Sequence, residues 1–226
     1  MNSTVELATR LGEERLPGGW NLLRLKAADT ARRLTPGLMP VIDGQARTVM
    51  ASDAAGGTLS VILRDTESLA ETPAITGLAG TAAPLPRGRV LLVGQERGLF
   101  ALVHWLAALR RQPDTDLLVL LGTPGRFPFQ PAPSRIYLPD MPPHVIATMP
   151  LLDDWHIPGR LAHVDGLPGC YEGEVLDFAA SWLNQLTGEA RGATHLVLAG
   201  APSWCDSAHA RLSPSAPASL TTQTLP

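Results

Sequence analysis

Cysteine and lysine are both scarce in this chain of 226 residues. Only Cys170 and Cys205 are present, too few for a disulfide framework or for the four thiolates of a zinc or iron–sulfur site. Lys26 is the single lysine, and the net charge is −3. Because the chain has no block of basic residues, its charge pattern gives no indication of nucleic acid or an anionic membrane surface as a partner.

Long apolar runs are lacking as well. No run approaches the roughly 20 residues that a membrane-spanning helix requires. The first residues have neither the basic segment nor the apolar core of a secretory signal peptide. We therefore expect a cytoplasmic protein that is not inserted in a membrane.

Glycine and proline, by contrast, are abundant, with 21 residues of each, which exceeds average usage. Hydrophobic residues make up 45% of the chain and charged residues 17%, as in a globular protein with a sizeable core. The excess of turn formers favours many short elements over a helical bundle.

The first third of the chain has the pattern of a small β-barrel. Short runs of strand-like composition cover residues 20–25, 38–42, 47–51 and 58–64. Turn formers such as Asp43-Gly44 separate them, and residues 27–34 fit a short helical turn. Short strands at close intervals predict an antiparallel barrel over residues 18–86, preceded by a separate segment, 1–17.

The pattern changes after residue 86. Two nearly continuous apolar runs, 89–93 and 116–121, are typical of buried parallel strands, and an amphipathic helix over 99–111 follows the first. Further strands are expected at 144–148, 159–163 and 195–199, and helices at 174–186 and 205–212. We predict a doubly wound parallel-sheet α/β domain over 87–212, then a disordered low-complexity tail, 213–226.

Glycines stand where two of these strands end. Gly94 and Gly98 frame the turn between the strand 89–93 and its helix, and Gly200 follows the strand 195–199. Helix N-termini at such turns offer unpaired N–H groups and a positive dipole end to phosphate, which suggests a crevice the size of a dinucleotide. The same glycines are also expected at a turn that binds nothing, because positive φ and close helix packing require them.

Other reactive residue types give weaker patterns. Asp153, Asp154 and His156 lack a second ligand pair at suitable spacing, so we expect a solvated loop and no metal site. His163 fits a surface or core position better than a reactive one. Neither cysteine has a base or basic cluster nearby in the sequence that would lower its pKa. We therefore assign no catalytic acid, base or nucleophile.

Six short motifs occur in a suggestive order: residues 36–39, 47–50, 77–85, 94–98, 165–166 and 199–204. With the barrel and the α/β domain, they resemble the ferredoxin–NADP reductase superfamily over residues 18–212. Within it, they are most similar to the electron-transfer subunit of class B dihydroorotate dehydrogenase. Residues 36–39 resemble the family's proline–glycine–glutamine–phenylalanine turn, and residues 47–50 its arginine–x–aromatic–serine flavin motif.

The resemblance implies a role for each matching position. Arg47 would neutralise the flavin pyrophosphate, with Thr48 beside it, and Val49 stands where an aromatic packs on the flavin ring. Gly80 and Thr81 would approach the flavin phosphates. The remaining implied contacts are with the nicotinamide dinucleotide: Gly94, Gly98, Leu99, Gly200 and Asp165, the last at a turn where the family sets cofactor specificity.

The function that the resemblance implies is an oxidoreductase-like electron-transfer protein. It would pass electrons between NAD(P)H, FAD and a redox partner such as the dihydroorotate dehydrogenase catalytic subunit, in pyrimidine biosynthesis. Two cysteines leave no means to hold the iron–sulfur cluster of the family's subunit.

An alternative is a non-catalytic scaffold or regulatory subunit that has lost cofactor binding. It is favoured by five departures from the motifs: Val49, Met50, Gln95, Glu96 and Ala199. A nucleotide-binding module without redox chemistry is a third reading.

Overall fold

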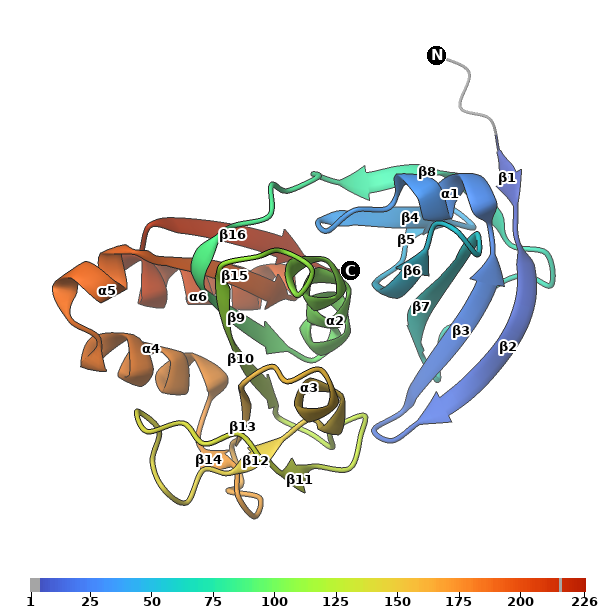
Figure 1. The fold of residues 1–226 in the computed structure, drawn as a ribbon. Coiled ribbons are helices and arrows are strands. Elements are labelled where there is room, and N and C mark those ends of the chain that lie inside the picture. Colours follow the sequence, from blue (N-terminus) through green and yellow to red (C-terminus); the bar gives the residue numbers. More distant parts are fainter. Residues whose placement is uncertain (1–4, 216) are drawn as a thin grey trace.

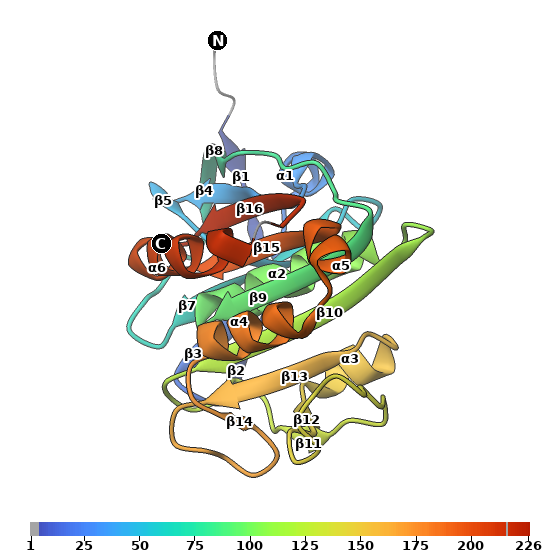
Figure 2. The same cartoon turned by 90° about the vertical axis from the view of Figure 1, so that its left-hand side faces the viewer.

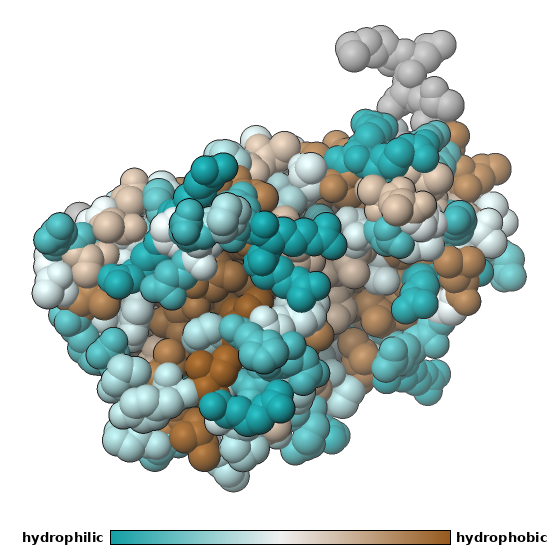
Figure 3. All heavy atoms as spheres, in the orientation of Figure 1, coloured by the Kyte–Doolittle hydropathy of each residue, from teal (hydrophilic) through white to brown (hydrophobic). Residues whose placement is uncertain are grey.

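The computed structural model describes residues 5–215 and 217–226. The chain forms two lobes side by side, a β-barrel from its first third and an α/β domain from the rest (Figure 1). Polar side chains cover much of the face in Figure 3, with apolar ones visible between them on both lobes. No helix in the described part of the chain has the length and apolar character needed to cross a membrane.

The barrel consists of two antiparallel four-stranded sheets, in the orders β1-β8-β4-β5 and β2-β3-β7-β6. Alternating apolar residues, such as Leu23 and Leu25 of β3, point into its core. Its elements are β1 (Glu6–Leu7), β2 (Thr9–Leu16), β3 (Trp20–Lys26), α1 (Ala28–Arg33), β4 (Leu38–Ile42), β5 (Gln45–Ala46), β6 (Val49–Asp53), β7 (Thr58–Arg64) and β8 (Ala74–Gly80).

The barrel begins earlier than the sequence predicted. Strand β2 pairs with β3 from Thr9 to Leu16, so the described residues before 18 are part of the barrel and not a separate segment. Nearly every side chain of β2 is exposed, which leaves no apolar alternation to detect. The strand is held by its backbone ladder with β3. Strand β8, which includes residues 77–80 of the motif 77–85, pairs with β4 in the same way.

The α/β domain is built on a six-stranded parallel sheet in the order β14-β13-β10-β9-β15-β16. Figure 2 shows this sheet from the face that α4 and α6 cover. This confirms the predicted fold class. The strands are β9 (Gly88–Gln95), β10 (Thr115–Thr123), β13 (Gly159–His163), β14 (Tyr171–Glu172), β15 (Thr194–Gly200) and β16 (Ser219–Thr224). Their central residues, such as Leu92 and Val119, are fully buried.

Helices cover both faces of this sheet. The helix α2 (Arg97–Leu109) lies on the face toward the barrel, and α4 (Val175–Gln185) and α6 (Pro202–Leu212) cover the other (Figure 1). The remaining elements are α3 (Pro150–Asp154), α5 (Gly188–Gly192), the 3-10 turn η1 (Ser213–Ser215) and the short strands β11 (Ala132–Pro133) and β12 (Ala147–Thr148). Of the strand expected at 144–148, only β12 forms.

The predicted disordered tail is wrong for the described residues. Residues 219–224 form β16, which pairs in parallel with β15 along its whole length. Leu225 is buried beyond it. The Oε1 atom of Gln223 accepts a 2.7 Å hydrogen bond from Nε1 of the buried Trp105 in α2. The composition of the tail is polar, but its threonines suit a strand and the edge of β15 supplies a backbone ladder.

Replacing Gln223 tests this tail contact. In Gln223→Met the indole N–H of Trp105 loses its acceptor inside the core, and we expect a loss of about 1–3 kcal/mol in the free energy of unfolding. Urea unfolding followed by tryptophan fluorescence measures it. Thr222→Val, an exposed change on the same strand, is the control. Equal stability of both variants would contradict the contact.

Candidate functional site

Open parallel sheets bind ligands outside the carboxyl ends of their strands, where the strand order reverses. In this sheet that point lies between β9 and β15. The structure brings the predicted Gly94, Gly98 and Gly200 together there. The three glycines therefore meet at one edge of the sheet, while the crevice the size of a dinucleotide stays a prediction.

Protein atoms account for these three glycines. A Cβ added to Gly98 would lie 1.8 Å from the carbonyl oxygen of Ala199, so α2 packs directly on the backbone of β15. A Cβ on Gly94 would meet Leu102, and one on Gly200 would lie 2.4 Å from the ring of Trp204. Close packing therefore explains these positions without a phosphate.

The N-terminus of α2 is partly used by the chain itself. The N–H of Leu99 donates to the carbonyl of Glu96 at 3.1 Å, and the Leu99 side chain is buried in the core. Glu96, at the N-cap, has a φ of 52° and makes no side-chain cap. The contacts of Gly94, Gly98, Leu99 and Gly200 with a dinucleotide stay predictions.

The residues of the predicted flavin motif, 47–50, are mostly buried. Arg47 is 6% exposed, and Thr48 and Val49 are buried. Val49 packs in the barrel core, while Met50 packs against both the α2 side of the sheet and the Trp20 cluster. The Nε of Arg47 and the Oγ1 of Thr48 are buried without a hydrogen-bond partner among the described residues.

Arg47 belongs to a group of charged residues between the two lobes, which we call the arginine cluster: Arg47, Arg64, Arg97, Glu67 and Glu96. Glu67 lies after β7, and its carboxylate accepts hydrogen bonds from Arg47 Nη1 and Arg97 Nη2, each at 2.6 Å. The backbone N–H of Arg64 also donates to it at 2.6 Å. Arg64 in turn pairs with Glu96 at 3.1 Å. The cluster thus links the barrel to the start of α2.

The surroundings fix the charge of Glu67. Burial alone would raise the pKa of its carboxyl group, but the N–H of Arg64 and the guanidinium groups of Arg97 and Arg47 outweigh that effect and hold the pKa below its ordinary value. The guanidinium of Arg64 lies 3.5 Å above the ring of Trp20, a cation–π contact. Sequence reasoning missed both Glu67 and Trp20.

Side chains of β6 and α2 contact each other, and a groove of about 900 Å³ lies beside this contact, lined by residues of α1, β6, α2 and the segment 82–85. Oγ of Ser52 and Nε2 of His104 are joined by a 3.1 Å hydrogen bond across the contact. Phe100 of α2 meets Trp20 of β3 edge to face, with ring centroids 5.2 Å apart. Met50 packs against the same apolar cluster. Burial lowers the pKa of His104 to about 4, so this histidine is neutral at pH 7.

Gly80 is the last residue of β8, and Thr81 follows it. A Cβ on Gly80, whose φ is 87°, would stand 2.3 Å from the carbonyl oxygen of Gly37, so the pairing of β4 with β8 requires this glycine. Thr81 is exposed. Its phosphate contact, like that of Gly80, stays a prediction.

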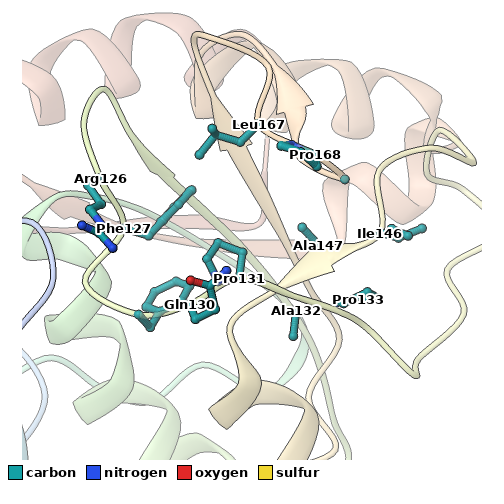
Figure 4. A pocket seen from close by; sticks show the side chains of 12 residues that line it. Arg126, Phe127, Gln130, Pro131, Ala132, Pro133, Ile146, Ala147, Leu167 and Pro168 are labelled. Carbon is teal, nitrogen blue, oxygen red and sulfur yellow. The ribbon is translucent and has the colours of Figure 1, made fainter.

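A separate cavity of about 510 Å³ lies beyond the carboxyl ends of β10 and β13 (Figure 4). Phe127, Phe129 and Leu167 give it apolar walls, and Arg126 and Gln130 add polar groups. Its size falls in the range of small-molecule sites. The sequence did not reveal it, because its walls come from the irregular proline-rich stretch after β10 and from the loop after β13.

His163 and Asp165 shape the loop beside this cavity. Nδ1 of His163 accepts the N–H of Asp165 at 3.1 Å, so its Nε2 carries the proton and donates to the carbonyl of Gly125 at 3.0 Å. The Asp165 carboxylate is exposed on the loop after β13. It lies at the carboxyl edge as expected, and its role in cofactor specificity stays a prediction.

The other reactive groups have structural partners. Asp153 accepts hydrogen bonds from Ser134 and from the backbone of Arg135. Burial raises the pKa of Cys170 and of Cys205 to about 11, so both thiols stay protonated and unreactive at neutral pH.

No protein-family model matches the chain, and no curated protein does. Solved structures do match. A ferredoxin reductase of carbazole 1,9a-dioxygenase has a TM-score of 0.72 at 15% identity, over 98% of this chain and 69% of that one. An Amycolatopsis cytochrome P450 reductase has a TM-score of 0.69 at 15% identity, with the same coverage. A ferredoxin-NADP+ reductase from Plasmodium falciparum has a TM-score of 0.67 at 10% identity, over 100% of this chain and 98% of that one. This chain has the two-domain fold of ferredoxin reductase-like FAD/NAD-binding proteins.

Proposed function

We propose that this chain is a non-catalytic subunit on a ferredoxin reductase-like scaffold, which binds a redox enzyme as its partner without holding a flavin of its own. The proposal rests on the contact between β6 and α2, where Met50 packs on the cluster of Phe100 and Ser52 bonds to His104, beside an open groove of about 900 Å³. A flavin ring lying against β6 at this contact would have to displace these side chains.

The other residues implied by the flavin motif agree with this reading. The side chain of Arg47 is already paired with Glu67, and Thr48 is fully buried. The Nε of Arg47 and the Oγ1 of Thr48 have no partner among the described residues, but burial closes both atoms to a pyrophosphate or ribityl chain that arrives from solvent. To reach Arg47 Nη1, a flavin pyrophosphate would have to displace the Glu67 carboxylate.

The visible spectrum of the purified protein tests the proposal. After expression in riboflavin-rich medium we expect no absorption near 450 nm, the region of flavin absorption, and no such band in protein that has been incubated with FAD and desalted. A stoichiometric flavin band would contradict the proposal. Met50→Ser places a small polar residue beside the interface. A flavin band in this variant but not in the wild type would show that the Met50 side chain excludes the flavin ring.

A second candidate is the electron-transfer oxidoreductase that passes electrons from NAD(P)H through FAD to a partner. It is favoured by the buried Nε of Arg47 and Oγ1 of Thr48, which lack partners among the described residues, as they would beside a missing ligand. The 510 Å³ cavity at the carboxyl edge offers room for a nucleoside.

Turnover separates the two candidates. The second predicts reduction of an artificial acceptor by NADH or NADPH in the presence of FAD, whereas the first predicts none. The partner that we propose in either case, a dihydroorotate dehydrogenase catalytic subunit, is tested by co-purification of the two proteins. An inactive protein that co-purifies with this dehydrogenase supports the first candidate.

A further inference from the structure

The arginine cluster has the composition of an anion site that already holds an anion. Two guanidinium groups, from Arg47 and Arg97, and the backbone N–H of Arg64 converge on the Glu67 carboxylate, each at 2.6 Å. Charge-assisted bonds of this length from arginines and a backbone N–H are the means by which proteins hold carboxylates and phosphates. The group that they hold here belongs to the chain itself.

Burial restricts what else Arg47 can bind. Its side chain is 7% exposed, its Nη1 is taken by Glu67, and its Nε faces the interior without a partner among the described residues. The Glu67 side chain is 25% exposed, so solvent reaches it. An outside anion that is to pair with Nη1 of Arg47 must therefore take the position of the Glu67 carboxylate.

The charges of the cluster favour an anion at that position. Three arginines face two glutamates, and Glu96 is already paired with Arg64. Without Glu67, three positive groups would share one negative group in a partly buried place, where Coulomb interactions are weakly screened. An oxyanion with several oxygens would suit the three donors.

Glu67 also joins the two lobes. It lies in the loop after β7 of the barrel and pairs with Arg97 in the first turn of α2, while Arg47 precedes β6. We propose that Glu67 is an internal ligand, which occupies an oxyanion site formed by Arg47, Arg97 and the Arg64 N–H. It keeps that site closed to phosphate-bearing ligands and ties the barrel to the α/β domain without a coenzyme. This deepens the proposed function and rests on it in one respect, because both leave Arg47 without a coenzyme.

The test replaces the internal ligand and offers an external one. Inorganic pyrophosphate is titrated at low salt into the full-length wild-type chain, Glu67→Ala and Glu71→Ala, an exposed glutamate of the same loop. We expect Glu67→Ala to unfold at a lower temperature than the wild type. It should bind pyrophosphate at least about tenfold more tightly than the wild type or Glu71→Ala, and regain thermal stability with it.

Two outcomes would overturn the inference. One is a folded Glu67→Ala protein that binds pyrophosphate no better than the wild type. The other is wild-type protein that binds it as well as the variant, since the site would then be open already. If Glu67→Ala does not fold, Glu67→Gln carries the test, because its amide oxygen can still accept the Arg64 N–H while the charge is gone.

The flavin experiment remains distinguishable from this one. Wild-type protein that takes up FAD would contradict the non-catalytic proposal. The inference about Glu67 would stand only if pyrophosphate still bound at least about tenfold more tightly to Glu67→Ala than to the wild type, because the flavin would then not occupy the Arg47–Arg97 site. Colourless wild-type protein together with a Glu67→Ala variant that gains nothing would leave the proposed function in place and remove the internal ligand.

Discussion

Acidification from pH 7.5 to 5.5 should lower the free energy of unfolding by about 1 kcal/mol through His104 alone. Burial holds the pKa of this histidine at about 4 in the folded chain, against an ordinary value of 6.5. A folded-state pKa below the unfolded one means that the unfolded chain takes up the proton first. The stabilisation is therefore complete above pH 6.5 and is lost as the pH falls toward 4, where the whole loss reaches about 3 kcal/mol.

Urea unfolding at a series of pH values measures this effect. His104→Gln keeps a hydrogen-bonding group for Ser52 but cannot be protonated, so it should remove most of the slope between pH 7.5 and 5.5. His144→Gln, at an exposed loop position, should leave the slope as it is. The proposed burial of a neutral histidine between β6 and α2 fails if His104→Gln has the wild-type slope.

The parts of the fold that the sequence predicted are those with strong side-chain patterns. The strands β9 and β10 are continuous apolar runs because both of their faces are covered by other parts of the protein. The helix α2 showed its apolar period in Leu99, Leu102 and Leu106 for the same reason. Burial dictated the residue types in these elements, so the residue types revealed them.

The strands that the sequence did not predict are held by backbone pairing with neighbouring strands. The side chains of β2 are nearly all exposed, β8 is rich in glycine, and β16 consists mostly of serine, threonine and glutamine. Each completes a backbone ladder on a strand that is already fixed. No local periodicity records such a ladder, so a single sequence does not distinguish these strands from loop or tail.

The candidate site likewise contains residues that the sequence predicted and residues that it did not. The glycines at the ends of β9 and β15 were predictable, because parallel strands bring their carboxyl ends to one edge. The partner of Arg47 was not. Glu67 lies 20 residues further along the chain, in a loop whose course depends on the whole barrel. Family resemblance suggests a ligand for that arginine, and the structure gives it a carboxylate of the chain.

Gly98→Ala should be the most damaging single substitution that we predict. The added Cβ would lie 1.8 Å from the carbonyl oxygen of Ala199 and 2.6 Å from its carbonyl carbon. Both are backbone atoms of a buried strand, so no side chain can turn away to make room. We expect a loss of at least about 3 kcal/mol, above the usual range for an overpacked core, although alanine by itself favours a helix by about 1 kcal/mol over glycine.

Gly192→Ala is the matched control, since nothing lies within 4 Å of a Cβ at that helical position. It should leave stability unchanged or raise it by up to about 1 kcal/mol. The comparison decides between the two explanations of the glycine turn after β9. If phosphate binding were the reason for glycine at this position, Gly98→Ala would fold with wild-type stability, because a methyl group facing an open crevice would contact no backbone atom. A glycine kept for packing makes the same methyl group force α2 away from β15, so the chemical midpoint of urea unfolding must fall.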